Sequence, residues 1–107
     1  MLTFYMLVNG EIRETTDVRE WGRWYETTPE RIVEQTRVGQ RDVSTIFLGI
    51  DHNFFGKGPP LLFETMVFNL DSGSSGEEQR RWATLKEAKL GHLAICRMLE
   101  VEGAPVV

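Results

Sequence analysis

The sequence predicts an α+β domain in which an antiparallel sheet of four to six strands has two helices packed on one face. Short runs of β-branched and aromatic residues recur along the chain between turn-forming residues, which is typical of strands. Two other segments repeat apolar residues with helical spacing. At 107 residues with 41% hydrophobic content, the chain is expected to form a single domain, 1–107.

A β-hairpin is predicted at the N-terminus. The run from Leu2 to Val8 consists of β-forming residues, and Asn9-Gly10 follows it directly. Both residues of an Asn-Gly pair accept the positive φ of a type I′ turn. The chain should therefore return as a short polar strand over 11–14, which suits an edge position.

The first helix is predicted over 18–26. Asp17, followed three residues later by Glu20, matches a capping box, and both acids favour the positive end of the helix dipole. The segment Thr27-Thr28-Pro29 should end the helix. Its apolar face would consist of Val18, Trp21 and Tyr25, with Trp24 beside them.

The segment 30–38 permits two interpretations. Pro29 suits the first turn of a helix. However, 32–38 is rich in β-branched residues, and Gly39-Gln40 suits a two-residue hairpin turn. We therefore predict a strand over 32–38, paired with a second strand over 41–50.

The strand over 41–50 alternates between two sets of side chains. The first set is the more uniformly apolar, and we expect it to face the helices; it contains Ser44, Ile46, Leu48 and Ile50. The second set would then lie on the uncovered face; it contains Val43, Thr45 and Phe47.

The second half of the chain continues the sheet and ends in a helix. Strands are predicted over 61–68 and 78–83, with a flexible Gly/Ser-rich linker over 71–78 between them. Thr84 and Glu87 form a capping box for a helix that runs to about residue 100, and a loose tail is expected over 104–107. The apolar stripe of this helix consists of Leu85, Ala88, His92, Ile95, Cys96 and Leu99.

The composition narrows the functional classes. A formal charge of −4 with scattered basic residues argues against a general nucleic-acid binder. Cys96 is the one cysteine, so an internal disulfide is excluded and a reducing cytoplasm is expected. No apolar run reaches the roughly 18 residues of a membrane span, and the N-terminus lacks the basic region of a signal peptide.

The connection over 51–60 is the predicted functional site. Ten residues exceed the two to five of most hairpin loops, and long loops on a rigid scaffold often carry function. The candidate binding residues in it are Asp51, His52, Asn53 and Lys57. A purely structural role, in which Asp51 and His52 hydrogen-bond to the loop backbone, is the alternative.

Two histidines raise the question of chemistry. Asp51, His52 and Glu64 could bind a divalent metal and activate a water, although their spacing matches no known metal motif. His92 lies on an apolar helical stripe, so it would be either a neutral core residue or a neighbour of Glu64. Cys96 shares that stripe and is expected to be inert.

Two segments carry a family resemblance. VSTIFLGIDHNF (43–54) and GPPLLFETMVF (58–68) are similar to segments of small proteins encoded by bacteriophage and prophage genomes. The resemblance covers roughly 21–92 and departs mainly at 72–76 and at the C-terminus. It brings no catalytic assignment or cofactor. It implies an accessory protein in the cytoplasm of the bacterial host that acts by binding, inhibition or sequestration.

The resulting hypothesis is a non-catalytic phage accessory protein that binds a nucleotide-like ligand or a host protein through the 51–60 loop, to counter host defence. Trp24, Arg81 and Trp82 would contribute stacking and charge to the ligand site. The alternatives are a small metal-dependent hydrolase that uses Asp51, His52 and Glu64, and a structural or assembly component of the virion.

A homodimer is also predicted. Because two helices cover only one face of the sheet, the other face would expose large side chains such as Phe47 and Phe63. We expect a second copy to bury that face or the long loop, and a charged residue at either phenylalanine to dissociate the dimer.

Overall fold

The computed structural model describes residues 2–73 and 75–103, so the expected tail over 104–107 lies outside the described residues. Six strands and two helices occur in the described residues. In chain order they are β1 (Phe4–Val8), β2 (Glu11–Thr15), α1 (Val18–Thr27), β3 (Ile32–Val38), β4 (Arg41–Phe47), β5 (Phe63–Asn69), β6 (Ser75–Trp82) and α2 (Leu85–Glu102). Neither described helix is long and apolar enough to cross a membrane.

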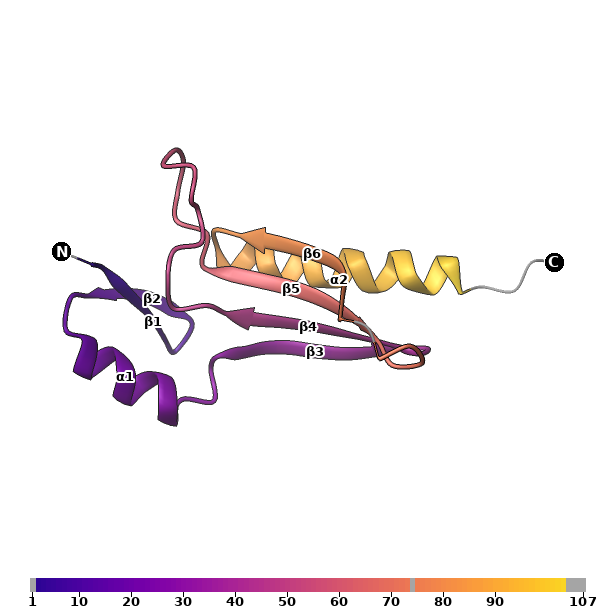
Figure 1. The fold of residues 1–107 in the computed structure, drawn as a ribbon, viewed down its shortest axis with the longest axis horizontal. Helices are drawn as coiled ribbons and strands as arrows, with labels where there is room; N and C mark the ends of the chain where they lie inside the picture. Colours follow the sequence, from indigo (N-terminus) through magenta and orange to yellow (C-terminus); the bar gives the residue numbers. More distant parts are fainter. Residues whose placement is uncertain (1, 74, 104–107) are drawn as a thin grey trace.

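The strands form two antiparallel sheets. β1 pairs with β2, and the remaining strands form a meander in the order β3-β4-β5-β6 (Figure 1). The predicted α+β class is confirmed, and so is the strand at 32–38. Strand β6 begins at Ser75, within the segment predicted as a linker.

Each helix packs on a different sheet, rather than both on one face. Helix α1 contacts the hairpin β1–β2, whereas α2 contacts all four strands of the larger sheet. Two tryptophans tie α1 to β1: the indole of Trp21 donates to the carbonyl of Tyr5 at 3.1 Å, and that of Trp24 to the carbonyl of Leu7 at 3.0 Å. The N-terminus of α1 is capped by Asp17, as predicted.

The hairpin is anchored to the larger sheet at two points. The amide of Tyr5 donates to the carbonyl of Gly49 at 2.9 Å, just beyond β4. The carboxylate of Glu30 accepts from the amides of Asn9 and Gly10 at 2.9 and 3.1 Å. Because these contacts join the turn and β1 to distant segments, the hairpin has a defined position beside the four-stranded sheet.

The inner face of β4 is the reverse of the predicted one. Val43, Thr45 and Phe47 are buried toward α2, whereas Ser44 and Ile46 are only half-buried. The alternation of side chains along β4 correctly divides them into two sets, but it does not determine which set faces the core. A threonine is acceptable inside here because Thr45 hydrogen-bonds to a histidine of α2.

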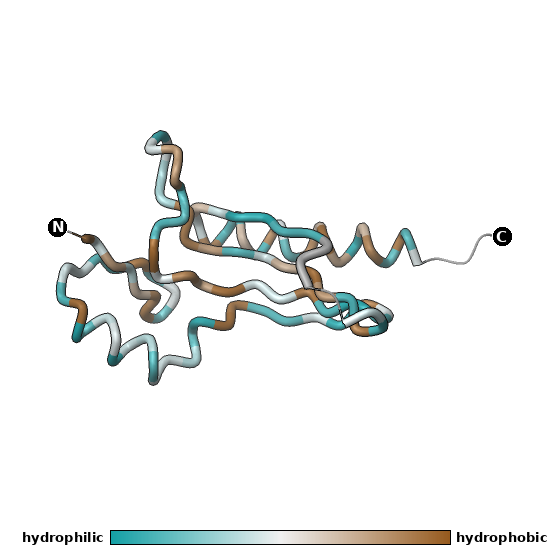
Figure 2. Tube along the Cα trace, viewed as in Figure 1, coloured by the Kyte–Doolittle hydropathy of each residue, from teal (hydrophilic) through white to brown (hydrophobic). Residues whose placement is uncertain are grey.

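Because the inner face is reversed, the uncovered face of the sheet does not expose the two phenylalanines of the predicted dimer interface. Phe47 and Phe63 are buried within the monomer, and their rings meet edge-to-face at 5.1 Å. A charged residue at either position would therefore disrupt the core rather than an interface. The apolar colouring in Figure 2 also collects where β4 and β5 meet the hairpin, while β6 is hydrophilic along much of its length.

The core has two clusters. One lies between the hairpin and the sheet and contains Tyr5, Leu7, Phe47, Leu62, Phe63 and Ala88. The other lies under the C-terminal half of α2 and contains Val43, Val67, Ile95, Cys96 and Leu99. Trp82 packs against both clusters, so this side chain joins them.

Trp82 reaches this position because α2 has no side chain at Gly91. A methyl group added at Gly91 would overlap the Trp82 indole, whereas one added at Gly22 of α1 would meet no atom within 4 Å. The two helical glycines therefore have opposite roles, one required for close packing and the other not.

Replacing each glycine with alanine tests this packing. Gly91→Ala should lower the free energy of unfolding by about 1–3 kcal/mol, because the tryptophan must move. Gly22→Ala should raise it by about 0.5–1 kcal/mol, because alanine favours the helix. Urea denaturation followed by circular dichroism measures both, and equal stability of the two variants would contradict the packing described.

Candidate functional site

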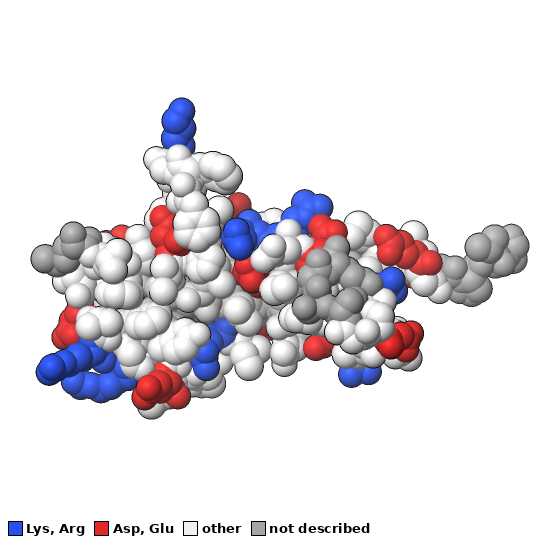
Figure 3. All heavy atoms as spheres, in the orientation of Figure 1, with Lys and Arg blue, Asp and Glu red and all other residues white. Residues whose placement is uncertain are grey.

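The loop over 51–60 projects from the body of the protein beside the start of β5 (Figure 1). Its tip carries two aromatic side chains that have almost no cover: Phe54 is 75% exposed and Phe55 is 92% exposed. Large apolar side chains are rarely this exposed side by side unless they serve an interaction. The projection also stands out in the space-filling view (Figure 3).

The base of the loop is fixed by side chains that bind its own backbone. One carboxylate oxygen of Asp51 accepts from the amides of Asn53 at 2.7 Å and Leu61 at 2.9 Å. The amide of His52 donates to the carbonyl of Leu61 at 3.0 Å, which closes the base from the other strand. The two ends of the loop are thus held together without a long hairpin ladder.

The tip is also internally braced. The side-chain amide of Asn53 donates to the carbonyls of Lys57 and Pro59, the latter at 3.0 Å. The φ of 83° at Gly58, beside this contact, favours glycine over other residues. The loop therefore presents Phe54 and Phe55 from a conformation that is defined before any partner binds.

These contacts show what the predicted loop residues bind within the protein. Asp51 and Asn53 support the backbone, and His52 donates from Nδ1 to the carbonyl of Ile50 at 2.9 Å. The structural interpretation of Asp51 and His52 is thus the one observed, while the Lys57 side chain is left exposed. Phe54 and Phe55 are not among the residues predicted from the sequence. Two adjacent aromatic residues in a Gly/Pro-rich loop are the pattern that could have indicated them.

The three predicted ligand-binding residues outside the loop do not join it. Trp24 packs against Phe47, with ring centroids 5.6 Å apart. The indole of Trp82 donates to Thr65 at 3.0 Å on the α2 side of the sheet. Arg81, on the opposite face, is paired with a carboxylate. In the described structure, these hydrogen bonds and ring contacts of the three side chains thus lie outside the loop.

That carboxylate belongs to Glu64, which is only 7% exposed. It accepts from Nε of Arg81 at 2.9 Å and from the side-chain amide of Gln79 at 3.0 Å. Residues 2–73 and 75–103 contain no group of three or more His, Cys, Asp or Glu side chains able to hold a metal. Asp51, His52 and Glu64 thus lack the convergence that the metal-dependent hydrolase requires.

His92 is a core histidine, and it lies on the sheet face opposite Glu64. Its Nδ1 is 2.7 Å from the hydroxyl of Thr45, and its Nε2 is 2.9 Å from that of Thr36. Thr45 is in turn 2.6 Å from Thr65, which accepts from Trp82. A neutral imidazole, with one donor and one acceptor nitrogen, completes this chain of hydrogen bonds.

Burial shifts the titration of two groups on α2. Desolvation lowers the pKa of His92, and the negative charge of Glu34 opposes this shift only in part. Burial likewise raises the pKa of the Cys96 thiol. A neutral histidine and a protonated, buried thiol suit a structural role better than a catalytic one.

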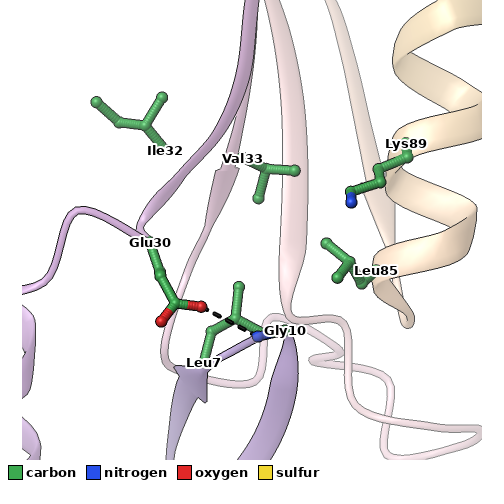
Figure 4. A pocket seen from close by; sticks show the side chains of 7 residues that line it. All are labelled: Leu7, Gly10, Glu30, Ile32, Val33, Leu85 and Lys89. Atoms are coloured by element: carbon green, nitrogen blue, oxygen red, sulfur yellow. Dashed lines mark hydrogen bonds between the residues drawn. The ribbon is translucent and has the colours of Figure 1, made fainter.

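A hollow of about 250 Å³ lies between the hairpin turn, β3 and the first turns of α2 (Figure 4). It is lined by Leu7, Gly10, Glu30, Ile32, Val33, Leu85 and Lys89. Glu30 faces this hollow, but both of its carboxylate oxygens accept from the hairpin turn. Both oxygens of this carboxylate thus hold the hairpin turn in place, and no second acid lines the hollow among the described residues.

Comparison with known proteins adds no relative. No protein-family model matches the chain, and neither the curated proteins nor the solved structures contain a significant match. The resemblance to phage-encoded proteins therefore stays a prediction.

We predict that the Asp51 carboxylate controls the order of the loop. Asp51→Ala removes the acceptor of two backbone amides, so the loop should open and chymotrypsin should cleave faster after Phe54 or Phe55. Because the loop lies outside both core clusters, global unfolding should change by no more than about 1–3 kcal/mol. Unchanged cleavage at matched stability would show that Asp51 does not hold the loop.

His92 should make stability depend on pH. Its folded pKa lies below the unfolded value of about 6.5. Above that pH the imidazole is neutral in both states. As the pH falls further, the unfolded chain binds the proton first, so the free energy of unfolding decreases toward the folded pKa.

Urea denaturation between about pH 5 and 7 measures this slope, and His92→Gln provides the control. The variant should be less stable at every pH, because it breaks the buried chain of hydrogen bonds. It should also lose the part of the slope that His92 contributes. An equal slope in the two proteins would contradict the assignment.

Proposed function

We propose that this chain is a binding protein that docks on another protein through the tip of its 51–60 loop. The observation that carries the proposal is the pair Phe54 and Phe55, 75% and 92% exposed on an internally braced loop. Each phenylalanine contributes about 1.5–3 kcal/mol when it moves from water into an apolar pocket.

Because the loop is braced by internal hydrogen bonds, burial of Phe54 and Phe55 can give a higher affinity for the partner. Binding normally costs free energy because flexible loops must become ordered. The hydrogen bonds of Asp51 and Asn53 have already met that cost during folding. Aromatic anchors presented in this way are typical of the few residues that dominate protein interfaces.

The charge of the loop defines the partner further. Lys57 is the one lysine or arginine of 51–60 and is exposed, in a protein of formal charge −4. The space-filling view has basic atoms at the outer end of the projection (Figure 3). The matching surface is an apolar pocket for one or two phenylalanines with an acidic group at its rim.

The family resemblance supports a host protein as the partner. The resemblance implies an accessory protein that acts by binding, inhibition or sequestration, and counteraction of a host defence is the role expected from the sequence. This version of the proposal also places the protein in the bacterial cytoplasm. It needs no catalytic group, in keeping with the structural roles of Asp51, His52, Glu64 and His92.

Capture from bacterial lysate tests the proposal. The immobilised wild-type chain should retain a protein that the double variant Phe54→Ser/Phe55→Ser does not retain. Lys57→Glu should weaken capture of the same protein, and about a tenfold or larger loss of affinity is expected for the double serine variant. Titration calorimetry with the purified partner measures that loss.

Leu70→Ser is the matched control, because Leu70 is also an exposed apolar residue but lies after β5. It should bind like the wild type. Circular dichroism should give all variants the same melting temperature, since none of the changed side chains belongs to the core. Equal capture by wild type and the double serine variant would overturn the proposal.

A further inference from the structure

Helix α2 has a second apolar face that nothing in the described structure covers. Its inner face meets the sheet, but Leu90 is 59% exposed and Val101 is 75% exposed on the outer side, with Leu93 and Ala94 between them. The outer face therefore has a continuous apolar stripe. Arg97 also lies on it and can lay its aliphatic stem along such a surface.

Four charged side chains of α2 are arranged against the dipole of the helix, although Glu87 in its first turn follows the dipole. Lys86 and Lys89 lie in its first half, near the positive end, whereas Glu100 and Glu102 lie in its last turn, which has no basic residue. This arrangement is unfavourable within a single helix. It becomes favourable when a second copy of α2 lies antiparallel, because each basic end then meets an acidic end.

The spacing of these charges fits such a pair. Lys89 and Glu100 are eleven residues apart, which is about three helical turns, so both lie on the same flank of α2. In an antiparallel pair related by a two-fold axis, like flanks meet. Lys89 of each copy then lies opposite Glu100 of the other, and small Ala94 lies close to the axis.

A hollow on α2 matches the same register. It has a volume of about 370 Å³ and is lined by Leu85, Lys86, Lys89 and Leu90. With Lys89 opposite Glu100, the Val101 side chain of the second copy lies at the level of this hollow. The hollow adjoins the one in Figure 4, since Leu85 and Lys89 line both. The contact thus extends past the helix itself.

We infer that the protein forms a symmetric dimer through antiparallel α2 helices, with Val101 of each copy seated between Leu85 and Leu90 of the other. The interface differs from the sheet face predicted from the sequence, which lacks the exposed phenylalanines it would need. An interface built mainly from one helix of each copy is small, so the dissociation constant should be micromolar. This inference does not depend on the proposed function of the loop.

Sedimentation velocity of the full chain, from low micromolar to submillimolar concentration, tests the inference. The wild type should show a monomer–dimer equilibrium, and Val101→Glu should raise the dissociation constant at least about tenfold. Val101 is exposed, so its melting temperature under monomeric conditions should stay that of the wild type. A wild type that is monomeric throughout, or a Val101→Glu variant that still dimerises fully, overturns the inference.

A charge exchange tests the register. Lys89→Glu and Glu100→Lys should each weaken the dimer, because like charges then meet, and the double variant should restore it. A double variant weaker than either single one would overturn the antiparallel register. Phe55→Asp should dimerise like the wild type and lose only the capture expected for the loop. Failure of the dimer and failure of the loop proposal are therefore distinguishable.

Discussion

The arrangement of the four-stranded sheet depends on one buried chain of hydrogen bonds. It runs from Thr36 through His92, Thr45 and Thr65 to the indole of Trp82, and so joins β3, α2, β4, β5 and β6. A buried polar group without a partner is costly, whereas a fully paired network specifies one arrangement. This chain of hydrogen bonds therefore determines which face of the sheet meets α2. It also explains why His92 stays neutral and why Gly91 must leave room for Trp82.

The uncovered face of the same sheet is stabilised differently. Glu64 is almost fully buried there, but Arg81 and Gln79 donate to its carboxylate from the adjacent edge strand. Their side chains cover part of a face that would otherwise expose β5 to water. Other exposed apolar side chains lie away from this face, at the loop tip and on the outer side of α2.

These two surfaces could work together. The 51–60 loop follows β4 and the outer face of α2 lies beyond the other side of the sheet, so binding through one does not occupy the other. A dimer through α2 would present two copies of the loop. If the two copies can engage one assembly at once, their combined affinity exceeds that of a single loop without any new contact.

The sequence by itself determined the local structure. The Asn-Gly turn, the helix caps at Asp17 and Thr84 and the strand at 32–38 depend on neighbouring residues, and all are observed. The tertiary structure alone decided which set of alternating side chains in β4 faces inward, and that Asp51 and Asn53 bind backbone while Phe54 and Phe55 stay exposed. Alternation separates two faces but is symmetric between them. Only the distant partner, here His92 for Thr45, makes one face lower in free energy.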